Sequence, residues 1–309
     1  MSEPLSNPSI KKLVSYVRAT RRHLVRDEGL CVSEARNNFF SHLFVEALRE
    51  ISGAAQSRDH SRTLQDELRA MLGCVPRFVE RAGDGACRRV EVPREIARML
   101  REDPITLGWA YQFWNEVERD DTTWAISRRK DESVLTSLSA ATQIFTEDYM
   151  ARFLVARCLS LVSKNGAARR TSVLDPACGA GHILAHVVRA LSAQSTMSGE
   201  AIAGAIFGCD IDGDVVEVCR AVLLLEIART RPGSMVGIWR ILGESVRALE
   251  HPHGTLQRNN APEPLNRGFS CVITNPPYIG RRKMPHEMRE FLEREYSDTW
   301  MDLCSAFMH

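Results

Sequence analysis

Apolar residues recur at helical spacing through the first half of the chain. Between residues 10 and 25, Leu13, Val17 and Leu24 alternate with lysines and arginines, which predicts an amphipathic helix with a basic face. That face is either solvated or a surface for phosphate groups. Similar patterns predict helices over residues 39–51, 62–72 and 93–100, and one short strand over residues 88–92.

The end of this helical half is marked by two segments. Residues 107–114 are dense in aromatic side chains, which favours a place in the hydrophobic core over a recognition surface. Residues 120–132 are charged and break the pattern, so a loop or domain boundary is expected there. We therefore divide the chain into a mostly helical region over residues 1–132 and a second domain over residues 133–309.

The second half alternates short β-rich runs with helical patterns. Helices are predicted over residues 182–192 and 214–230. Strands are predicted over residues 172–175, 205–210, 236–242 and 269–274. This alternation predicts an α/β fold with a parallel, doubly wound sheet, whose ligand lies at the carboxyl ends of the strands.

Composition narrows the class of protein. In 309 residues, 40 Lys and Arg balance 39 Asp and Glu, a net charge of +1 that excludes a polycationic tail but allows a local basic patch. The nine cysteines form no Cys-x-x-Cys pair, so neither a disulfide framework nor a metal site is predicted. The N-terminus lacks the apolar stretch of a signal peptide, and no apolar run is long enough to span a membrane. We expect a cytoplasmic protein without membrane partners.

The loop after the first predicted strand carries ligand-binding chemistry. Asp175 ends the strand, and Gly179 and Gly181 form a Gly-x-Gly turn that lets the backbone approach a ligand closely. Leu184 stands where a nicotinamide-binding loop would have its third glycine, and no Gly-Lys-Ser/Thr sequence is present for nucleotide triphosphates. A carboxylate at the start of the loop repels phosphate and suits a cation. S-adenosylmethionine, with its ammonium and sulfonium groups, fits these requirements.

Two further acidic residues stand at the ends of the next predicted strands. Asp210 ends the second strand and is placed to accept hydrogen bonds from both ribose hydroxyls of the cofactor. Glu244 ends the third and is expected to approach the adenine amino group. Three acids in register at successive strand ends favour a binding site over solvated loops.

The fourth predicted strand leads into Asn275, Pro276, Pro277 and Tyr278. Two prolines stiffen the backbone and remove N–H donors, which leaves carbonyl oxygens facing the cleft. With the Asn275 side-chain oxygen, these carbonyls can accept both hydrogens of a planar amino group and free its lone pair to attack a methyl sulfonium. Tyr278 offers a ring on which a base or an amide plane can stack.

Together these segments resemble the N6-adenine DNA methyltransferases of the γ order, in which the cofactor motif precedes the catalytic motif. The resemblance covers roughly residues 105–309. It assigns catalysis to Asn275, Pro276, Pro277 and Tyr278. It assigns cofactor contacts to Phe145, Thr146, Asp175, Pro176, Ala177, Gly179, Gly181, Asp210, Ile211 and Glu244.

A narrower resemblance is carried by residues 107–114, 143–146 and 300–303. These segments are similar to large fused restriction–modification methyltransferases and to the BREX phage-defence methyltransferase. The match departs from the pattern at Glu147, where the family usually has proline, and at Cys304, where a large residue is common. The resemblance implies a defence enzyme with a Rossmann-like fold, which flips an adenine out of double-stranded DNA and methylates its N6.

Two other readings stay open. The sequence Asn-Pro-Pro-Tyr also occurs in enzymes that methylate glutamine side chains of release factors and in some RNA methyltransferases. A different class altogether is a non-catalytic fragment or a split subunit. The resembling fold has about three more strands after the Asn275 strand, followed by a target-recognition domain. We therefore expect an incomplete sheet, as in a truncated gene product, a split-gene subunit or a deliberate fragment, with a downstream-encoded subunit as a candidate partner.

Overall fold

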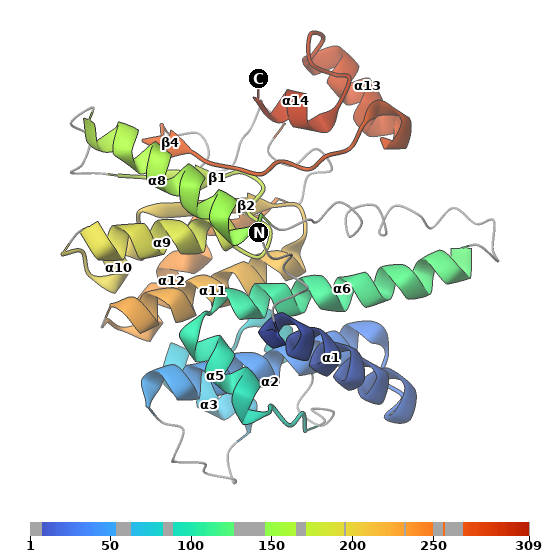
Figure 1. Cartoon of the computed structure of the whole chain (residues 1–309), viewed down its shortest axis with the longest axis vertical. Coiled ribbons are helices and arrows are strands. Elements are labelled where there is room, and N and C mark those ends of the chain that lie inside the picture. Colours follow the sequence, from blue (N-terminus) through green and yellow to red (C-terminus); the bar gives the residue numbers. More distant parts are fainter. Residues whose placement is uncertain are drawn as a thin grey trace.

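The structure, a computed structural model, places N-terminal helices, a parallel sheet and a small C-terminal lobe in succession (Figure 1). It describes residues 8–53, 63–82, 89–126, 146–164, 171–194, 196–231, 233–249, 256 and 268–308. None of the described helices is long and apolar enough to cross a membrane.

The prediction of a mostly helical first half is confirmed. Its helices are α1 (Pro8–Arg22), the π-helical turn η2 (His23–Asp27), α2 (Val32–Ser52), α3 (Leu64–Leu72), α4 (Arg77–Glu80), α5 (Arg94–Glu102) and α6 (Ile105–Ile126). The aromatic segment 107–114 lies in α6, and Tyr111, Phe113 and Trp114 are buried in the core as predicted.

Two details of this half differ from the prediction. Residues 89–93 form no strand, and residue 88 lies outside the described part of the chain. Helix α6 continues through residues 120–126, where the sequence predicts a loop or a domain boundary, while residues 127–132 are not described. Charge alone does not end a helix, and no proline or glycine interrupts the sequence between residues 109 and 126.

The sheet has four parallel strands in the order β3-β2-β1-β4. The strands are β1 (Val173–Asp175), β2 (Ile206–Asp210), β3 (Val246–Ala248) and β4 (Cys271–Val272). This is the order in which a doubly wound dinucleotide-type sheet begins, so the predicted α/β Rossmann-like architecture is confirmed. Asp175 pairs with Gly208 and Asp210 with Ala248, which brings the carboxyl ends of β1, β2 and β3 to one edge.

One predicted strand is wrong. Residues 236–242 belong to helix α12 (Met235–Ser245), and the third strand follows it at residues 246–248. The side chain of Ser234 caps this helix by accepting a hydrogen bond from the backbone N–H of Gly237 at 3.2 Å. Ile238 and Leu242 are buried one helical turn apart, which is the spacing of a helix.

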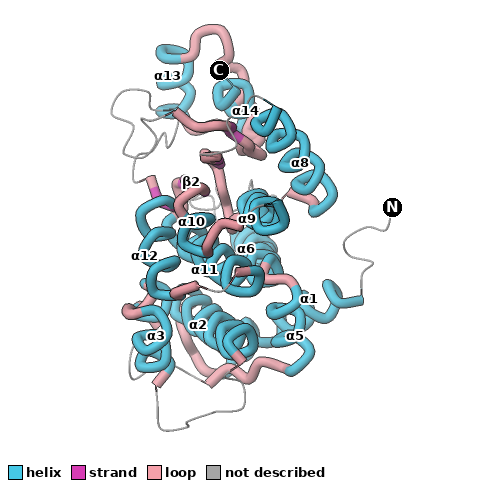
Figure 2. The backbone as a smooth tube through the Cα atoms, turned by 90° about the vertical axis from the view of Figure 1, so that its left-hand side faces the viewer, coloured by secondary structure: helices cyan, strands magenta, loops and turns pink. Residues whose placement is uncertain are grey.

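Helices cover one face of the sheet. They are α8 (Asp148–Lys164), α9 (His182–Gln194) and α11 (Gly213–Thr230), with α12 and the short α10 (Gly199–Ala203) beside them. The N-terminal helices pack on the far side of α9 and α11 from the C-terminal lobe (Figure 2). A single cluster of buried side chains runs through both halves of the chain.

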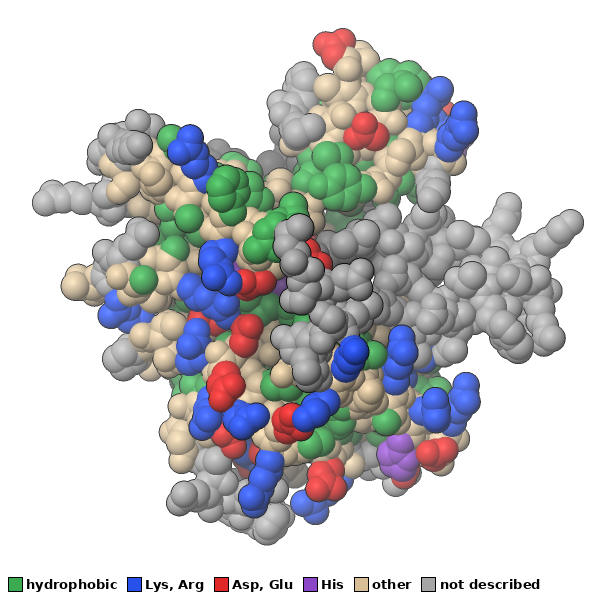
Figure 3. Space-filling view, in the orientation of Figure 1, with side chains coloured by type: hydrophobic (Ala, Val, Ile, Leu, Met, Phe, Trp, Pro, Cys, Tyr) green, Lys and Arg blue, Asp and Glu red, His purple; other side chains and the backbone are tan. Residues whose placement is uncertain are grey.

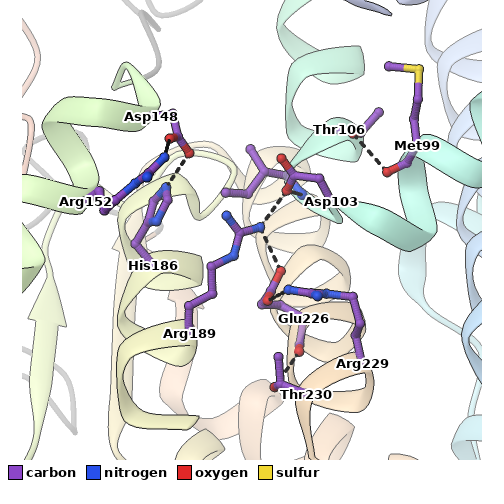
Figure 4. A network of polar contacts seen from close by, with 11 residues as sticks. Met99, Asp103, Thr106, Asp148, Arg152, His186, Arg189, Glu226, Arg229 and Thr230 are labelled. Carbon is purple, nitrogen blue, oxygen red and sulfur yellow. Dashed lines mark hydrogen bonds and ion pairs between the residues drawn. The ribbon is translucent and has the colours of Figure 1, made fainter. Parts of the chain in front are cut away.

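A polar network ties the two halves together inside this core (Figure 4). Glu226 of α11 is fully buried and accepts hydrogen bonds from Arg189 at 2.9 Å and from Arg229 at 2.5 Å. Arg189 also donates to Asp103, in the turn between α5 and α6, at 2.5 Å. The buried carboxylate is therefore paired on both oxygens, which a buried charge requires.

The C-terminal lobe has a small core of its own. It contains the 3₁₀ turn η6 (Arg281–Lys283), α13 (His286–Glu295) and α14 (Leu303–Met308). Its buried side chains are Leu256, Met284, Phe291, Leu292, Tyr296, Leu303 and Ala306. Antiparallel pairing of Gly280 with Asp302 joins the segment after β4 to the start of α14.

Candidate functional site

Hydrogen bonds from backbone N–H groups to two carboxylates link the ends of β1 and β2. Asp175 Oδ1 accepts a hydrogen bond from the N–H of Ala177 at 3.1 Å, which shapes the turn at Pro176. Asp210 Oδ2 accepts from the N–H of Gly179 at 2.9 Å, and its Oδ1 accepts from the N–H of Asp212 at 3.0 Å. One carboxylate thus holds the loop after β1 against the loop after β2. The ribose contacts predicted for Asp210 remain compatible with this, because each oxygen has a second lone pair.

The glycines of the first loop are required by its conformation. Gly179 has φ +50° and Gly181 has φ +85°, which side-chain-bearing residues rarely adopt. A Cβ atom on Gly181 would lie 2.8 Å from Cys219 Sγ in α11. The Gly-x-Gly turn of the sequence is therefore both a left-handed turn and a close contact between this loop and α11.

Two buried carboxyl groups at the strand ends favour a positively charged ligand. Burial raises the pKa of Asp175 to about 7, and the nearby carboxylate of Asp210 adds to the rise. Burial likewise raises the pKa of Asp210 to about 6. Two carboxylates that lose solvation beside each other are stabilised in their charged form by a bound positive group. A phosphate would have the opposite effect.

The other residues predicted to contact the cofactor differ in how exposed they are. Ile211 follows Asp210 with 55% of its side chain exposed, so an adenine ring can cover it. Thr146 is buried just before α8. Phe145 lies outside the described residues.

The position predicted for Glu244 is wrong. It is exposed within α12 and does not end a strand, because residues 236–242 are helical. The backbone that follows β3 reaches the site instead, where the N–H of Leu249 donates to the Asp210 carbonyl at 2.8 Å.

The Asn-Pro-Pro-Tyr segment follows β4, which pairs with β1, the strand that leads into the loop over residues 176–181. We name this the cofactor loop after its predicted role. The N–H of Ile273 donates to the carbonyl of Leu174 at 2.9 Å, one residue before Asp175. Pro276 is buried and Pro277 partly buried, which anchors the loop. The cofactor loop and this loop therefore emerge side by side from β1 and β4.

Tyr278 and Asn275 contact each other within this loop. The Tyr278 hydroxyl donates to Asn275 Oδ1 at 2.9 Å, while 63% of the tyrosine is exposed. The ring is thus free on the solvent side for stacking.

Basic side chains follow this loop directly. Arg281 lies over the Trp300 ring at 4.2 Å and pairs with Glu293 at 3.3 Å, while Arg282 is exposed. On the face seen in Figure 3, Lys and Arg alternate with Asp and Glu over the N-terminal helices. This mixing matches the neutral overall charge.

Another titratable residue near the cofactor loop, His182, begins α9. Burial and the positive charges of His186 and Arg189 hold its pKa at about 3, so it is neutral at physiological pH. Its ring packs edge-on against Trp109 at 4.9 Å between ring centres. Within the described part of the chain, no group of three His, Cys, Asp or Glu residues is arranged to hold a metal ion.

The strand order, the glycine loop after β1 and the acid after β2 are those of a Rossmann-like α/β fold. Residues 204–309 match the family of the Eco57I restriction-modification methylase. A methylase of this kind takes its methyl group from S-adenosylmethionine, in agreement with the cofactor predicted from the sequence.

Similar structures are distant. One is a putative class I S-adenosylmethionine-dependent methyltransferase from Listeria monocytogenes, with 13% identity, a TM-score of 0.40 and coverage of 98% of this chain and 69% of that chain. Another is the DrdV–DNA complex, with 12% identity and a TM-score of 0.47, where the alignment covers 99% of this chain but only 34% of the other. No curated protein matches the sequence.

Proposed function

We propose that this chain is an adenine-specific DNA methyltransferase of a restriction–modification or BREX-type phage-defence system. It transfers the methyl group of S-adenosylmethionine to N6 of an adenine flipped out of double-stranded DNA. The observation that carries the proposal is the adjacency of the two loops. β1 delivers Asp175 and Gly179, and the neighbouring β4 delivers Asn275, at one edge of the sheet.

The chemistry follows from the acceptors in the catalytic loop. Asn275 Oδ1 and the Pro276 carbonyl accept the two N–H groups of the adenine N6, which directs its lone pair away from the ring. Tyr278 stacks on the flipped base. With the cofactor bound, N6 would take the methyl group while the electron pair of the methyl–sulfur bond stays on sulfur, and the proton that N6 loses would pass to solvent. No covalent enzyme intermediate is needed.

The residues that would hold the cofactor fit its charge and shape. Asp175 and Asp210, whose pKa values are raised by burial, favour its positive groups. Gly179 and Gly181 leave room for close approach of the backbone, and Ile211 offers an exposed apolar surface to adenine. The cofactor supplies the electrophilic methyl group when bound.

The test replaces Asn275 with alanine. We expect transfer of tritiated methyl groups to DNA to fall by at least about 10²-fold, because a hydrogen-bond acceptor that acts in the transition state is lost. Cofactor affinity, measured by calorimetry, should stay within about threefold, because Asn275 lies outside the cofactor loop. Thr299→Ala in the C-terminal lobe serves as a folding control. Unchanged turnover of Asn275→Ala would contradict the catalytic assignment.

The hydrogen-bond acceptors of the catalytic loop also fit a second function, because they can hold planar amino groups other than that of adenine. Asn275 and Pro276 would hold the amide of a glutamine side chain or an amino group of RNA equally well. Offering the wild-type protein DNA, RNA and a release factor in parallel separates these substrates. Label in protein or RNA, and none in DNA, would favour the alternative.

The activity of the chain by itself is a separate question. In the described sheet β4 pairs with β1 alone, and Val272 is 55% exposed on it. An open apolar edge of this kind can pair with further strands, from a downstream-encoded subunit among other sources. Gel filtration and methylation assays with and without that subunit test this. A monomer active on DNA by itself would show that the chain does not need it.

A further inference from the structure

The N-terminal helical region contacts both loops of the cofactor site through one helix. Helix α6 packs against α9 and α11, which begin directly after the loops of β1 and β2. The contacts fall on Gly108 and Tyr111, which lie one helical turn apart and share a face of α6.

Tyr111 reaches the loop after β2. Its side chain is 1% exposed, and its hydroxyl donates to Asp212 Oδ2 at 3.2 Å. The other oxygen of Asp212 accepts from the N–H groups of Asp214 at 2.9 Å and Val215 at 3.3 Å, so it caps α11. The N–H of Asp212 is held by Asp210 Oδ1 at 3.0 Å. Tyr111 therefore contacts a residue that is itself hydrogen-bonded to Asp210, and the carboxylate of Asp210 also binds the Gly179 amide.

Two arginines form ion pairs with the first turn of α11. Arg36 of α2 and Arg81, just after α4, both pair with Asp214, the latter at 2.7 Å. The Arg36 guanidinium also lies 5.9 Å from the centre of the Tyr111 ring. The helical region thus surrounds the start of α11 with donors from three separate elements.

Gly108 reaches the loop after β1. A Cβ atom at this position would lie 2.7 Å from His182 Cε1 and 3.1 Å from the Cβ of Ala180. Ala180 lies between the two glycines of the cofactor loop, and His182 follows them. The absence of a side chain at residue 108 lets α6 lie directly against this loop.

We propose that α6 is a positioning element of the cofactor site, acting through Tyr111 and Gly108 on the loops after β2 and β1. The helical region would then be part of the binding site for S-adenosylmethionine, in addition to any role toward DNA. This inference rests on the proposed cofactor site and goes beyond it by assigning a function to residues that do not touch the cofactor.

The first test removes the Tyr111 hydroxyl. Tyr111→Phe should weaken S-adenosylmethionine binding about five- to tenfold in calorimetry, the effect of one lost buried hydrogen bond. In the cofactor-free protein, hydrogen exchange of the amides of residues 212–216 should become faster. The KM for the cofactor should rise, while kcat at saturating cofactor should stay within about twofold.

Tyr16→Phe is the matched control. Tyr16 lies in the same helical region, and its hydroxyl donates to the carbonyl of Glu91 at 3.1 Å, away from both loops. This variant should lose a similar hydrogen bond without changing cofactor affinity or exchange at residues 212–216. Equal effects of the two variants, or no effect of Tyr111→Phe, would overturn the inference.

The second test adds a methyl group at Gly108. Gly108→Ala should weaken cofactor binding at least about fivefold, because the new Cβ displaces His182 or Ala180. Gly243→Ala, in helix α12 with open space around it, should bind the cofactor as the wild type does. Wild-type protein that binds no cofactor would overturn the proposed function along with this inference. Binding by the wild type and by both α6 variants with equal affinity would overturn this inference alone.

Discussion

The buried carboxylate of Asp175 should make the cofactor-free protein less stable as pH rises. Its pKa increases from the ordinary 3.8 to about 7, mainly through burial, with only 1% of the residue exposed. At about 1.4 kcal/mol per pKa unit, this corresponds to about 4 kcal/mol. Because the folded pKa lies above the unfolded one, the stabilisation is complete below about pH 4 and is lost as pH rises through about 7.

Asp175→Asn removes this charge while its amide oxygen can still accept from the Ala177 N–H. Urea denaturation without cofactor should show the variant gaining stability over the wild type by roughly 2 to 3 kcal/mol between pH 5 and pH 8. Asp298→Asn, on the exposed surface of the C-terminal lobe, tests whether loss of any carboxylate has the same effect. A difference between Asp175→Asn and wild type that is the same at both pH values would refute the reasoning.

Two further variants probe the site and the core. Gly181→Ala should lower the free energy of unfolding by about 1 to 3 kcal/mol and weaken cofactor binding. The reason is that the positive φ of Gly181 and its contact with Cys219 both disfavour a Cβ atom. Calorimetry that shows wild-type affinity for the cofactor would argue against this. Glu226→Gln should cost about 3 to 5 kcal/mol in urea denaturation, because Arg189 and Arg229 lose their shared buried partner. Glu102→Gln, which removes an exposed ion pair with Arg98, is the control. A loss of stability no larger than that of the control would contradict the prediction.

Much of the sheet could be predicted because its strands are short apolar runs that end in polar residues. The strands at Asp175 and Asp210 are where the sequence places them, and the cofactor loop needs glycine for reasons visible in its spacing. The run over residues 236–242 was misassigned because a short apolar run is ambiguous between strand and helix. The signal that resolves it is Ser234, a helix cap directly before the run.

The contribution of the helical region could not be read from the sequence. Tyr111 was expected in the core, and it is buried there, but its hydroxyl contacts a residue 101 positions away. An Asp before a helical run, such as Asp212, is a recognisable cap, but the local pattern does not indicate that it also accepts a hydrogen bond from Tyr111. Such contacts depend on how helices pack, which local patterns do not specify.

The most direct measurement of the central claim is the chemical identity of the labelled product. Wild-type protein is incubated with tritiated S-adenosylmethionine and double-stranded DNA, and the DNA is digested to nucleosides and separated. We expect label in N6-methyladenine, and at least about 10²-fold less of it after Asn275→Ala. Label confined to methylated cytosine, or no label in the DNA, would contradict it.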